Sequence, residues 1–158
     1  MFPVYKPCSI SQSNRQLLTM ADNSSLCIWA PSDNPGEQQW ILERRGSDKV
    51  VLRNLKYNKY AGVQGTLQPA AEVSPTIQPI ELTMEPVEAD QYRLWAESEN
   101  GRLFLGCSPV PSATLPPKVR SYIELDWITM NSQLKSSSGC LRMRCITHGN
   151  SNMCGSSR

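Results

Sequence analysis

The sequence predicts an all-β protein of three similar units, a β-trefoil, and three observations lead to that prediction. A short pattern with the apolar residue Trp40, Ile80 or Trp127 at its centre recurs in segments 38–42, 78–82 and 125–129, at spacings of 40 and 47 residues. The strand signals between these segments are short and bounded by turn residues. No long stretch has the apolar period of a helix. We therefore expect four strands in each unit, twelve in all, around a shared apolar axis.

The strands are expected where short apolar segments lie between turn residues. These segments are residues 4–9, 16–20, 26–31 and 39–43 in the first unit, 50–55, 60–64, a proline-broken stretch at 67–73 and 77–84 in the second, and 92–96, 103–107, 119–123 and 126–130 in the third. Two hairpins should pass the chain from one unit to the next, through residues 43–49 and through an acidic turn after Leu82. The closing apolar residues Trp40, Ile80 and Trp127 are expected to pack near the common axis.

Residues 131–158 are predicted to form a tail outside the β-trefoil domain of residues 1–130. Ser, Gly, Asn and Cys are frequent there and apolar residues do not alternate with polar ones, so we expect a mobile segment. The tail holds the only histidine and three of the six cysteines: His148, Cys140, Cys145 and Cys154. These side chains are of the types that bind zinc, but their spacing lacks two closely spaced pairs. We therefore favour an unstructured tail over a zinc site and expect no metal and no cofactor.

Composition and charge exclude several classes of function. The chain has 158 residues, 19% of them charged, and a net charge of +2, as expected for a single globular domain. Its basic residues are scattered, whereas nucleic-acid binding requires a basic stripe. No apolar run approaches the ~20 residues that cross a bilayer, and no apolar region of a secretory signal is found near Met1. We expect a cytoplasmic protein with free thiols, or one exported by an unconventional route.

A catalytic role is not expected. Nucleophilic catalysis by serine or cysteine needs a histidine base in the folded body, and His148 lies in the predicted tail. No glycine-rich phosphate loop is present in the sequence. Carboxylate pairs such as Glu81 and Glu85 are typical of solvated hairpin faces. The expected function is therefore binding.

One part of the first unit resembles a known family. Residues 25–31 and 37–42, with the motif Gln38-Gln39-Trp40, resemble a repeat of the ricin-B-type lectins and of small fungal trefoil lectins. The resemblance covers residues 4–130; it is partial in the third unit, at Trp127, and weakest in the second, where Ile80 replaces the Trp. It implies that Gln38 fixes a turn by hydrogen bonding and that Trp40 packs in the core. The motif therefore supports the fold strongly and sugar binding only weakly.

The resemblance implies a place for a sugar in the first unit. A carbohydrate ring stacks its C–H face on an aromatic side chain, while carboxylates and amides bind its hydroxyls. In ricin-type repeats this aromatic residue lies on the third strand, where the chain has Trp29. Alternation along that strand directs Leu26 and Ile28 inward and Cys27 and Trp29 outward. The alternative is that the loop at residues 31–36, or the tail, covers Trp29.

Polar residues of the same unit are the candidate partners of the sugar hydroxyls: Asp22, Asn23, Asp33, Asn34 and Glu37. The resemblance implies an Asp close to the second strand and an Asn just before the Gln-x-Trp motif. In this chain the matching positions are near residues 19–22 and at Glu37. Neither position repeats the family pattern fully, which leaves the identity of the sugar open.

The second unit offers another candidate set: Tyr57, Tyr60, Gln64 and Gln78. Some fungal trefoil lectins use an aromatic cluster at the corresponding place to bind fucosylated chitobiose. This chain has Val63 and the sequence Gln78-Pro79-Ile80 where those lectins carry aromatics. Tyr57 and Tyr60 alternatively flank a turn, and the third unit, which shows only Tyr122, is expected not to bind.

The predicted function is that of a lectin-like protein that binds glycans or glycoproteins through surface sites. The main alternative is a protease inhibitor, because some mushroom β-trefoils block proteases with one exposed loop. Residues 108–118 form such a proline-stiffened loop, and residues 67–78 form a similar one. An interaction module of another kind is the third alternative.

Overall fold

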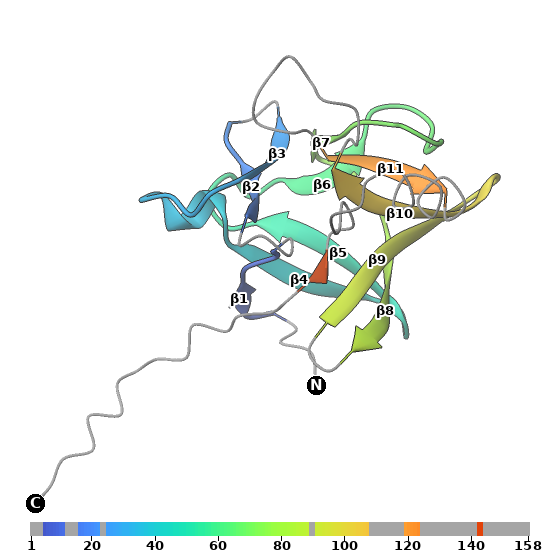
Figure 1. Cartoon of the computed structure of the whole chain (residues 1–158), viewed down its shortest axis with the longest axis horizontal. Helices are drawn as coiled ribbons and strands as arrows, with labels where there is room; N and C mark the ends of the chain where they lie inside the picture. The colour runs from blue at the N-terminus through green and yellow to red at the C-terminus, as the bar shows by residue number, and fades with distance from the viewer. Residues whose placement is uncertain are drawn as a thin grey trace, which may run out of the picture.

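The structure is a computed structural model, and it describes residues 5–11, 16–22, 25–88, 91–107, 119–123 and 142–143. Within these ranges the regular elements are strands and one turn of 3-10 helix (Figure 1). The first unit contains β1 (Pro7–Cys8), β2 (Leu17–Met20), β3 (Leu26–Trp29), η1 (Pro35–Glu37) and β4 (Trp40–Arg45). The second contains β5 (Lys49–Asn54), β6 (Tyr60–Val63), β7 (Val73–Thr76) and β8 (Leu82–Glu88). The third contains β9 (Gln91–Ser98), β10 (Gly101–Cys107) and β11 (Val119–Ile123), and β12 (Arg142–Met143) follows.

Antiparallel pairing joins most of these strands into one sheet. Its order is β1-β4-β5-β8-β9-β10-β11, with the β6–β7 hairpin attached to β5 and β12 attached to β9. The β2–β3 hairpin forms a separate two-stranded sheet. In Figure 1 the strands surround a common interior, with the β2–β3 and β6–β7 hairpins above β4 and β5. The chain thus has the predicted β-trefoil fold.

Both predicted hairpins between units are present. β4 pairs with β5 so that Leu42 lies opposite Leu52, and the turn between them contains Gly46, whose φ of 68° suits glycine. β8 pairs with β9 so that Met84 lies opposite Leu94. Apolar pairs directly opposite each other stabilise a hairpin and mark the face that it buries. The first unit therefore passes into the second, and the second into the third, through the same kind of connection.

The core is built from the inward faces of these strands. Trp40 is fully buried, and its Nε1 donates a hydrogen bond of 2.9 Å to the carbonyl of Leu18 on β2. Other fully buried side chains come from each of the three units: Leu42, Leu52, Leu82, Leu94 and Leu105. Ile80, which has the place in the second unit that Trp40 has in the first, is only 9% exposed. Trp127, the third predicted axial residue, lies outside the described residues.

One predicted strand of the second unit is a loop. β7 begins at Val73, so most of segment 67–73 is not paired as a strand. Ala70 has a positive φ of 64°, which a strand does not allow. The loop is held to β11 instead. The Ala70 N–H donates a hydrogen bond of 2.8 Å to the Ser121 carbonyl, and the Ser121 hydroxyl donates one of 2.7 Å to the Gln68 carbonyl. Contacts between distant segments thus decide the conformation of this stretch.

The two described residues of the segment predicted as a tail pair with the sheet. Arg142 and Met143 form β12 and pair with Arg93 and Tyr92 of β9, so the sheet continues past the predicted domain boundary at residue 130. The remaining residues of segment 131–158 lie outside the described part of the chain, and so do the strand expected at 126–130 and the four residues considered for zinc. Among the described residues, no group of three or more His, Cys, Asp or Glu side chains is placed to hold a metal ion.

The described ranges also contain no helix that is long and apolar enough to span a membrane.

Candidate functional site

Trp29 ends β3 with its side chain 46% exposed, so the loop at residues 31–36 leaves much of the indole accessible. The outward direction predicted for Cys27 is wrong, because Cys27 is only 4% exposed. Its cross-strand partner is Thr19, and the Thr19 hydroxyl accepts a hydrogen bond of 3.1 Å from the side-chain amide of Gln38. The segment that carries Gln38 therefore covers this face of the hairpin. β3 is buried on both faces until Trp29.

The surroundings of Cys27 keep its thiol protonated. Burial, together with the smaller effect of the negative charges of Asp22 and Glu37, raises the pKa of Cys27 to about 11. The thiol is consequently protonated at neutral pH, which makes it a poor nucleophile.

Gln38 fixes the loop that follows β3. Its side chain is buried, and its Nε2 donates to the carbonyl of Ala30 over 2.8 Å. Its Oε1 accepts a hydrogen bond of 2.9 Å from the Ser32 N–H. Together with the bond to Thr19, these contacts satisfy the buried amide and hold the start of the loop against β2 and β3. The loop carries two exposed candidates, Asp33 and Asn34, toward η1.

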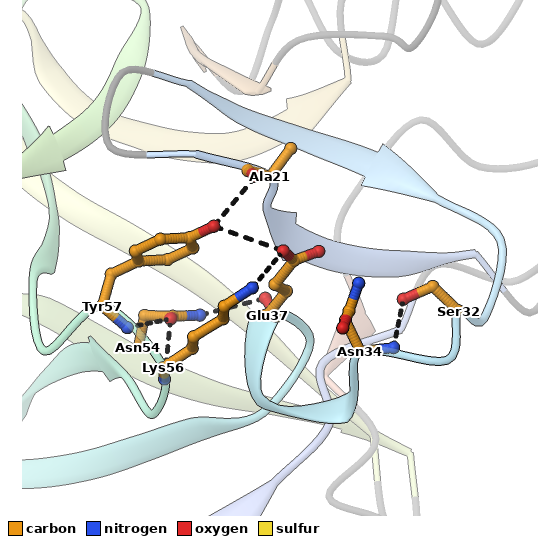
Figure 2. A network of polar contacts seen from close by, with 7 residues as sticks. All are labelled: Ala21, Ser32, Asn34, Glu37, Asn54, Lys56 and Tyr57. Atoms are coloured by element: carbon orange, nitrogen blue, oxygen red, sulfur yellow. Dashed lines mark hydrogen bonds and ion pairs between the residues drawn. The ribbon is translucent and has the colours of Figure 1, made fainter.

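Glu37 is the centre of a polar network at the end of η1 (Figure 2). Its Oε1 accepts a hydrogen bond of 2.7 Å from the Lys56 ammonium and lies 3.2 Å from the Tyr57 hydroxyl. The same hydroxyl is 3.1 Å from the carbonyl oxygen of Ala21, just after β2. The Lys56 ammonium also lies 5.1 Å from the centre of the Tyr57 ring. The turn between β5 and β6 therefore contributes two side chains to the first unit.

A buried asparagine holds that turn in place. Asn54 has no exposed surface, and its Oδ1 accepts hydrogen bonds from the N–H groups of Lys56 and Tyr57 over 3.1 and 3.0 Å. Its Nδ2 donates to the carbonyl of Glu37 over 3.0 Å. Figure 2 shows this amide below the aromatic ring, between the turn and η1. Asn54 thus fixes the two side chains that meet Glu37.

The structure separates two of the predicted first-unit residues. Trp29 lies opposite Leu17 at one end of the β2–β3 hairpin, whereas Asp22 lies beyond the other end, where Met20 pairs with Leu26. The Asp22 Oδ1 accepts hydrogen bonds from the N–H and the hydroxyl of Ser25, over 3.0 and 3.3 Å, which closes the hairpin turn.

Other predicted residues of this unit lie together on one short segment, the loop before η1 and η1 itself. Asn34 and Glu37 are linked by a backbone hydrogen bond of 3.1 Å from the Glu37 N–H to the Asn34 carbonyl. The Asn34 N–H donates to the Ser32 hydroxyl over 3.3 Å, and in Figure 2 the side chains of Asn34 and Glu37 point to the same side of the loop. Asn23 lies outside the described residues. The structure therefore brings Asn34, Glu37 and Tyr57 together rather than Asp22 and Trp29.

The four second-unit candidates do not converge on one place. Tyr57 and Tyr60 both direct their hydroxyls to carboxylates of the first unit, Glu37 and Glu43. Gln78 is exposed beside a hollow of about 410 Å³ that Ile80 also lines. Gln64 is exposed beside a separate hollow of about 470 Å³. The structure thus assigns the two tyrosines and the two glutamines to different surroundings.

Sequence reasoning missed the roles of Lys56 and Asn54. The run Lys56-Tyr57-Asn58 between two strands indicates a turn, and Asn58 has the positive φ of 55° that asparagine tolerates. No local pattern shows that this turn folds onto η1, because the contact joins residues of different units. Only the packing of one unit on the next reveals it.

Acid stability is expected to depend on the contacts of Glu43. Burial raises the pKa of a carboxyl, but here hydrogen bonds from Arg53 and Tyr60, with the charges of Arg53 and Arg45, outweigh it and lower the pKa below its ordinary 4.5. A lowered pKa in the folded state stabilises the fold above the unfolded pKa, and this contribution is lost as the pH falls through the folded pKa.

Tyr60→Phe is therefore expected to lower the free energy of unfolding at pH 7 by about 0.5–1.5 kcal/mol. The deficit should shrink as the pH falls below the unfolded pKa of about 4.3 and then through the lower folded pKa of Glu43. Urea denaturation of the wild type and Tyr60→Phe at pH 7 and pH 3 measures this deficit. A deficit of equal size at both pH values contradicts this account of Glu43.

Comparisons with known proteins agree with this fold. No protein-family model matches the chain, and no curated protein matches it. The ricin B-like lectin of Macrolepiota procera, solved in complex with lactose, has a TM-score of 0.65 and 19% identity over 77% of this chain and 88% of that one. The Rhizoctonia solani agglutinin has a TM-score of 0.68 and 13% identity, over 92% of this chain and 97% of that one. ThreeFoil, a designed threefold-symmetric protein, has a TM-score of 0.67 and 15% identity, over 87% of this chain and 96% of that one.

At these identities the likeness shows a shared fold. The resemblance stated from the sequence is therefore confirmed at that level: this chain folds like the fungal ricin B-like lectins.

Proposed function

We propose that the chain is a lectin-like, non-enzymatic protein that binds glycans through a surface of its first unit. The observation that supports this most directly is the 46% exposed indole of Trp29, at the end of a strand that is otherwise buried. An exposed indole presents a flat apolar face, which suits the C–H face of a pyranose ring. The likeness in fold to a lectin solved with lactose agrees with this function.

Polar groups close to the indole along the chain are suited to the sugar hydroxyls. The loop after β3 begins at the turn that Gln38 fixes, and its Asp33 and Asn34 side chains are exposed. Glu37 follows at the end of η1 with its carboxylate already oriented by Lys56. Side chains held in place before binding lose less freedom when the ligand arrives. Asp22 is left out of the proposed surface, because its carboxylate already accepts the hydrogen bonds from Ser25 that close the hairpin turn.

Replacing Trp29 by alanine is expected to weaken glycan binding at least tenfold while the melting temperature barely moves. Loss of an aromatic stacking surface removes roughly 1.4 kcal/mol or more of binding free energy, and that amount is tenfold in affinity. A glycan array identifies a bound glycan, and titration calorimetry with it compares the variants. Trp29→Phe should retain part of the affinity, because a smaller aromatic face remains.

A matched control is Ile77→Ala, which truncates another exposed apolar side chain, 82% exposed, in the second unit. It is expected to leave glycan binding unchanged. Equal glycan affinity of the wild type and Trp29→Ala contradicts the assignment of the site to Trp29. Unfolding of Trp29→Ala shows instead that the indole belongs to the core. Absence of binding by the wild type across a broad array rejects the function itself.

Protease inhibition gains no support from the structure. The loop at residues 108–118 lies outside the described residues. Of segment 67–78, Val73–Thr76 forms β7 and the preceding loop is hydrogen-bonded to β11 through Gln68 and Ala70. A segment held at both ends in this way does not have the free, protruding form expected of an inhibitory loop.

A further inference from the structure

Two tyrosines of the second unit make the same kind of contact with the first unit. The Tyr57 hydroxyl lies 3.2 Å from Oε1 of Glu37, and the Tyr60 hydroxyl donates to Oε2 of Glu43 over 3.0 Å. Both rings are half-buried. The two contacts differ in location, because Glu37 ends η1 beside the proposed binding loop, whereas Glu43 lies within β4, where Arg53 also binds it.

The Tyr57 hydroxyl contacts two separate segments of the first unit. Its hydroxyl is within hydrogen-bond distance of the Ala21 carbonyl, beyond the end of β2, and of the Glu37 carboxylate at the end of η1. Its own backbone is held by Asn54. A phenol has one proton to donate, so the proton is shared between the two acceptors. Figure 2 shows the hydroxyl between the hairpin and η1.

The turn that carries Tyr57 is also fixed against η1 through the backbone. The Lys56 N–H donates to the carbonyl of Gly36 over 3.1 Å, and the Leu55 N–H donates to the carbonyl of Gln39 over 3.0 Å. A Cβ at Gly36 would lie 3.2 Å from the Cβ of Lys56, so the two segments are in close contact. The Tyr57 hydroxyl is thus supported by a rigid turn.

We infer that Tyr57 is a positioning residue for the first-unit binding surface, supplied by the second unit. By holding the end of β2 against η1, it fixes the β2–β3 hairpin that carries Trp29 relative to the loop that carries Asn34 and Glu37. The inference rests on the proposed glycan-binding function. It adds that the surface is composite. The first unit supplies the Glu37 carboxylate, and the second unit supplies Tyr57, which helps to orient it.

The test compares Tyr57→Phe with Tyr60→Phe in the full chain. Each substitution removes one hydroxyl beside a first-unit carboxylate and keeps the ring, so the losses of stability should be similar. Tyr57→Phe is expected to weaken binding of the array-identified glycan about three- to tenfold, the effect of ordering one or two side chains on binding. Tyr60→Phe should remain within twofold of the wild type. Equal affinities in the two variants overturn the inference.

A double-mutant cycle with Glu37→Gln separates positioning from a general loss of packing. If Tyr57 acts through the Glu37 carboxylate, the effects of Tyr57→Phe and Glu37→Gln on affinity will not add. The effects of Tyr60→Phe and Glu37→Gln should add. Additive effects in the Tyr57 cycle contradict the proposed route.

The outcome also distinguishes this inference from the proposed function. Loss of binding in Trp29→Ala together with equal affinities in the two tyrosine variants retains the glycan site and rejects only the role of Tyr57. A wild-type protein that binds no glycan rejects the proposed function, and the inference with it.

Discussion

Replacing Trp40 by alanine is expected to lower the free energy of unfolding by about 3–5 kcal/mol, the range found when large aromatic side chains are removed from cores. Trp40 has no exposed surface, and β1 pairs with β4 at this residue through Cys8. The substitution also removes the donor to the Leu18 carbonyl, which then has no indole partner in the interior. Because domains of this size are stable by only ~5–15 kcal/mol, the loss is a large part of the total.

Urea denaturation followed by circular dichroism measures this loss. Trp29→Ala is the matched control, because it removes the same side chain from an exposed position and should change the free energy of unfolding by less than about 1 kcal/mol. The pair therefore separates the two tryptophans of the first unit by role, one for stability and one for binding. Similar losses in the two variants would contradict that separation.

Replacing Gly62 by alanine is expected to destabilise the second unit by about 1–3 kcal/mol, the cost of forcing an extra methyl group into a packed site. A Cβ at this position would come within 1.9 Å of the Thr76 hydroxyl oxygen and within 2.6 Å of the Gln78 carbonyl oxygen. Gly62 lies in β6 opposite Ser74 of β7, so the strand cannot shift without breaking the pair. The carbonyl belongs to the backbone and cannot rotate away.

Two further variants identify the cause of this effect. Gly46→Ala, in a turn with open space around it and a φ of 68°, should cost only the ~1–2 kcal/mol of a left-handed conformation. Thr76→Ala in the Gly62→Ala background should restore part of the stability, since it removes one of the two close contacts. Full restoration by Thr76→Ala, or no loss in Gly62→Ala, argues against the backbone clash with Gln78. Thermal unfolding of the four proteins measures these differences.

Much of the fold could be predicted because its signals are local. β11 has the bounds predicted for it, and β2 and β6 differ from their predictions by one residue at one end. Alternating apolar residues and turn residues are sufficient for such strands. Cys27 shows where this reasoning fails. Alternation directed it outward, but the side chain of Gln38 covers that face of the hairpin, and no pattern within the hairpin contains this information.

The candidate site was predicted less completely than the fold, because it depends on contacts between distant segments that local patterns do not contain. Trp29 could be singled out because an outward Trp on a short strand is unusual. Tyr57 was placed with the second unit because it follows β5 in the chain, yet its hydroxyl faces Glu37 and Ala21 of the first. A single sequence shows which residues can bind, but contacts between repeats decide which of them meet.

The hydrogen bonds between the long loop of the second unit and β11 have a consequence for the order of folding. The pairs Gln68 with Ser121 and Ala70 with Arg120 are separated by 53 and 50 residues along the chain. Contacts of such high sequence separation form only after the entropy of closing the intervening chain has been lost. A ribosome-bound chain that ends before β11 lacks the partner of this loop, so the loop can reach its final conformation only after β11 has been synthesised.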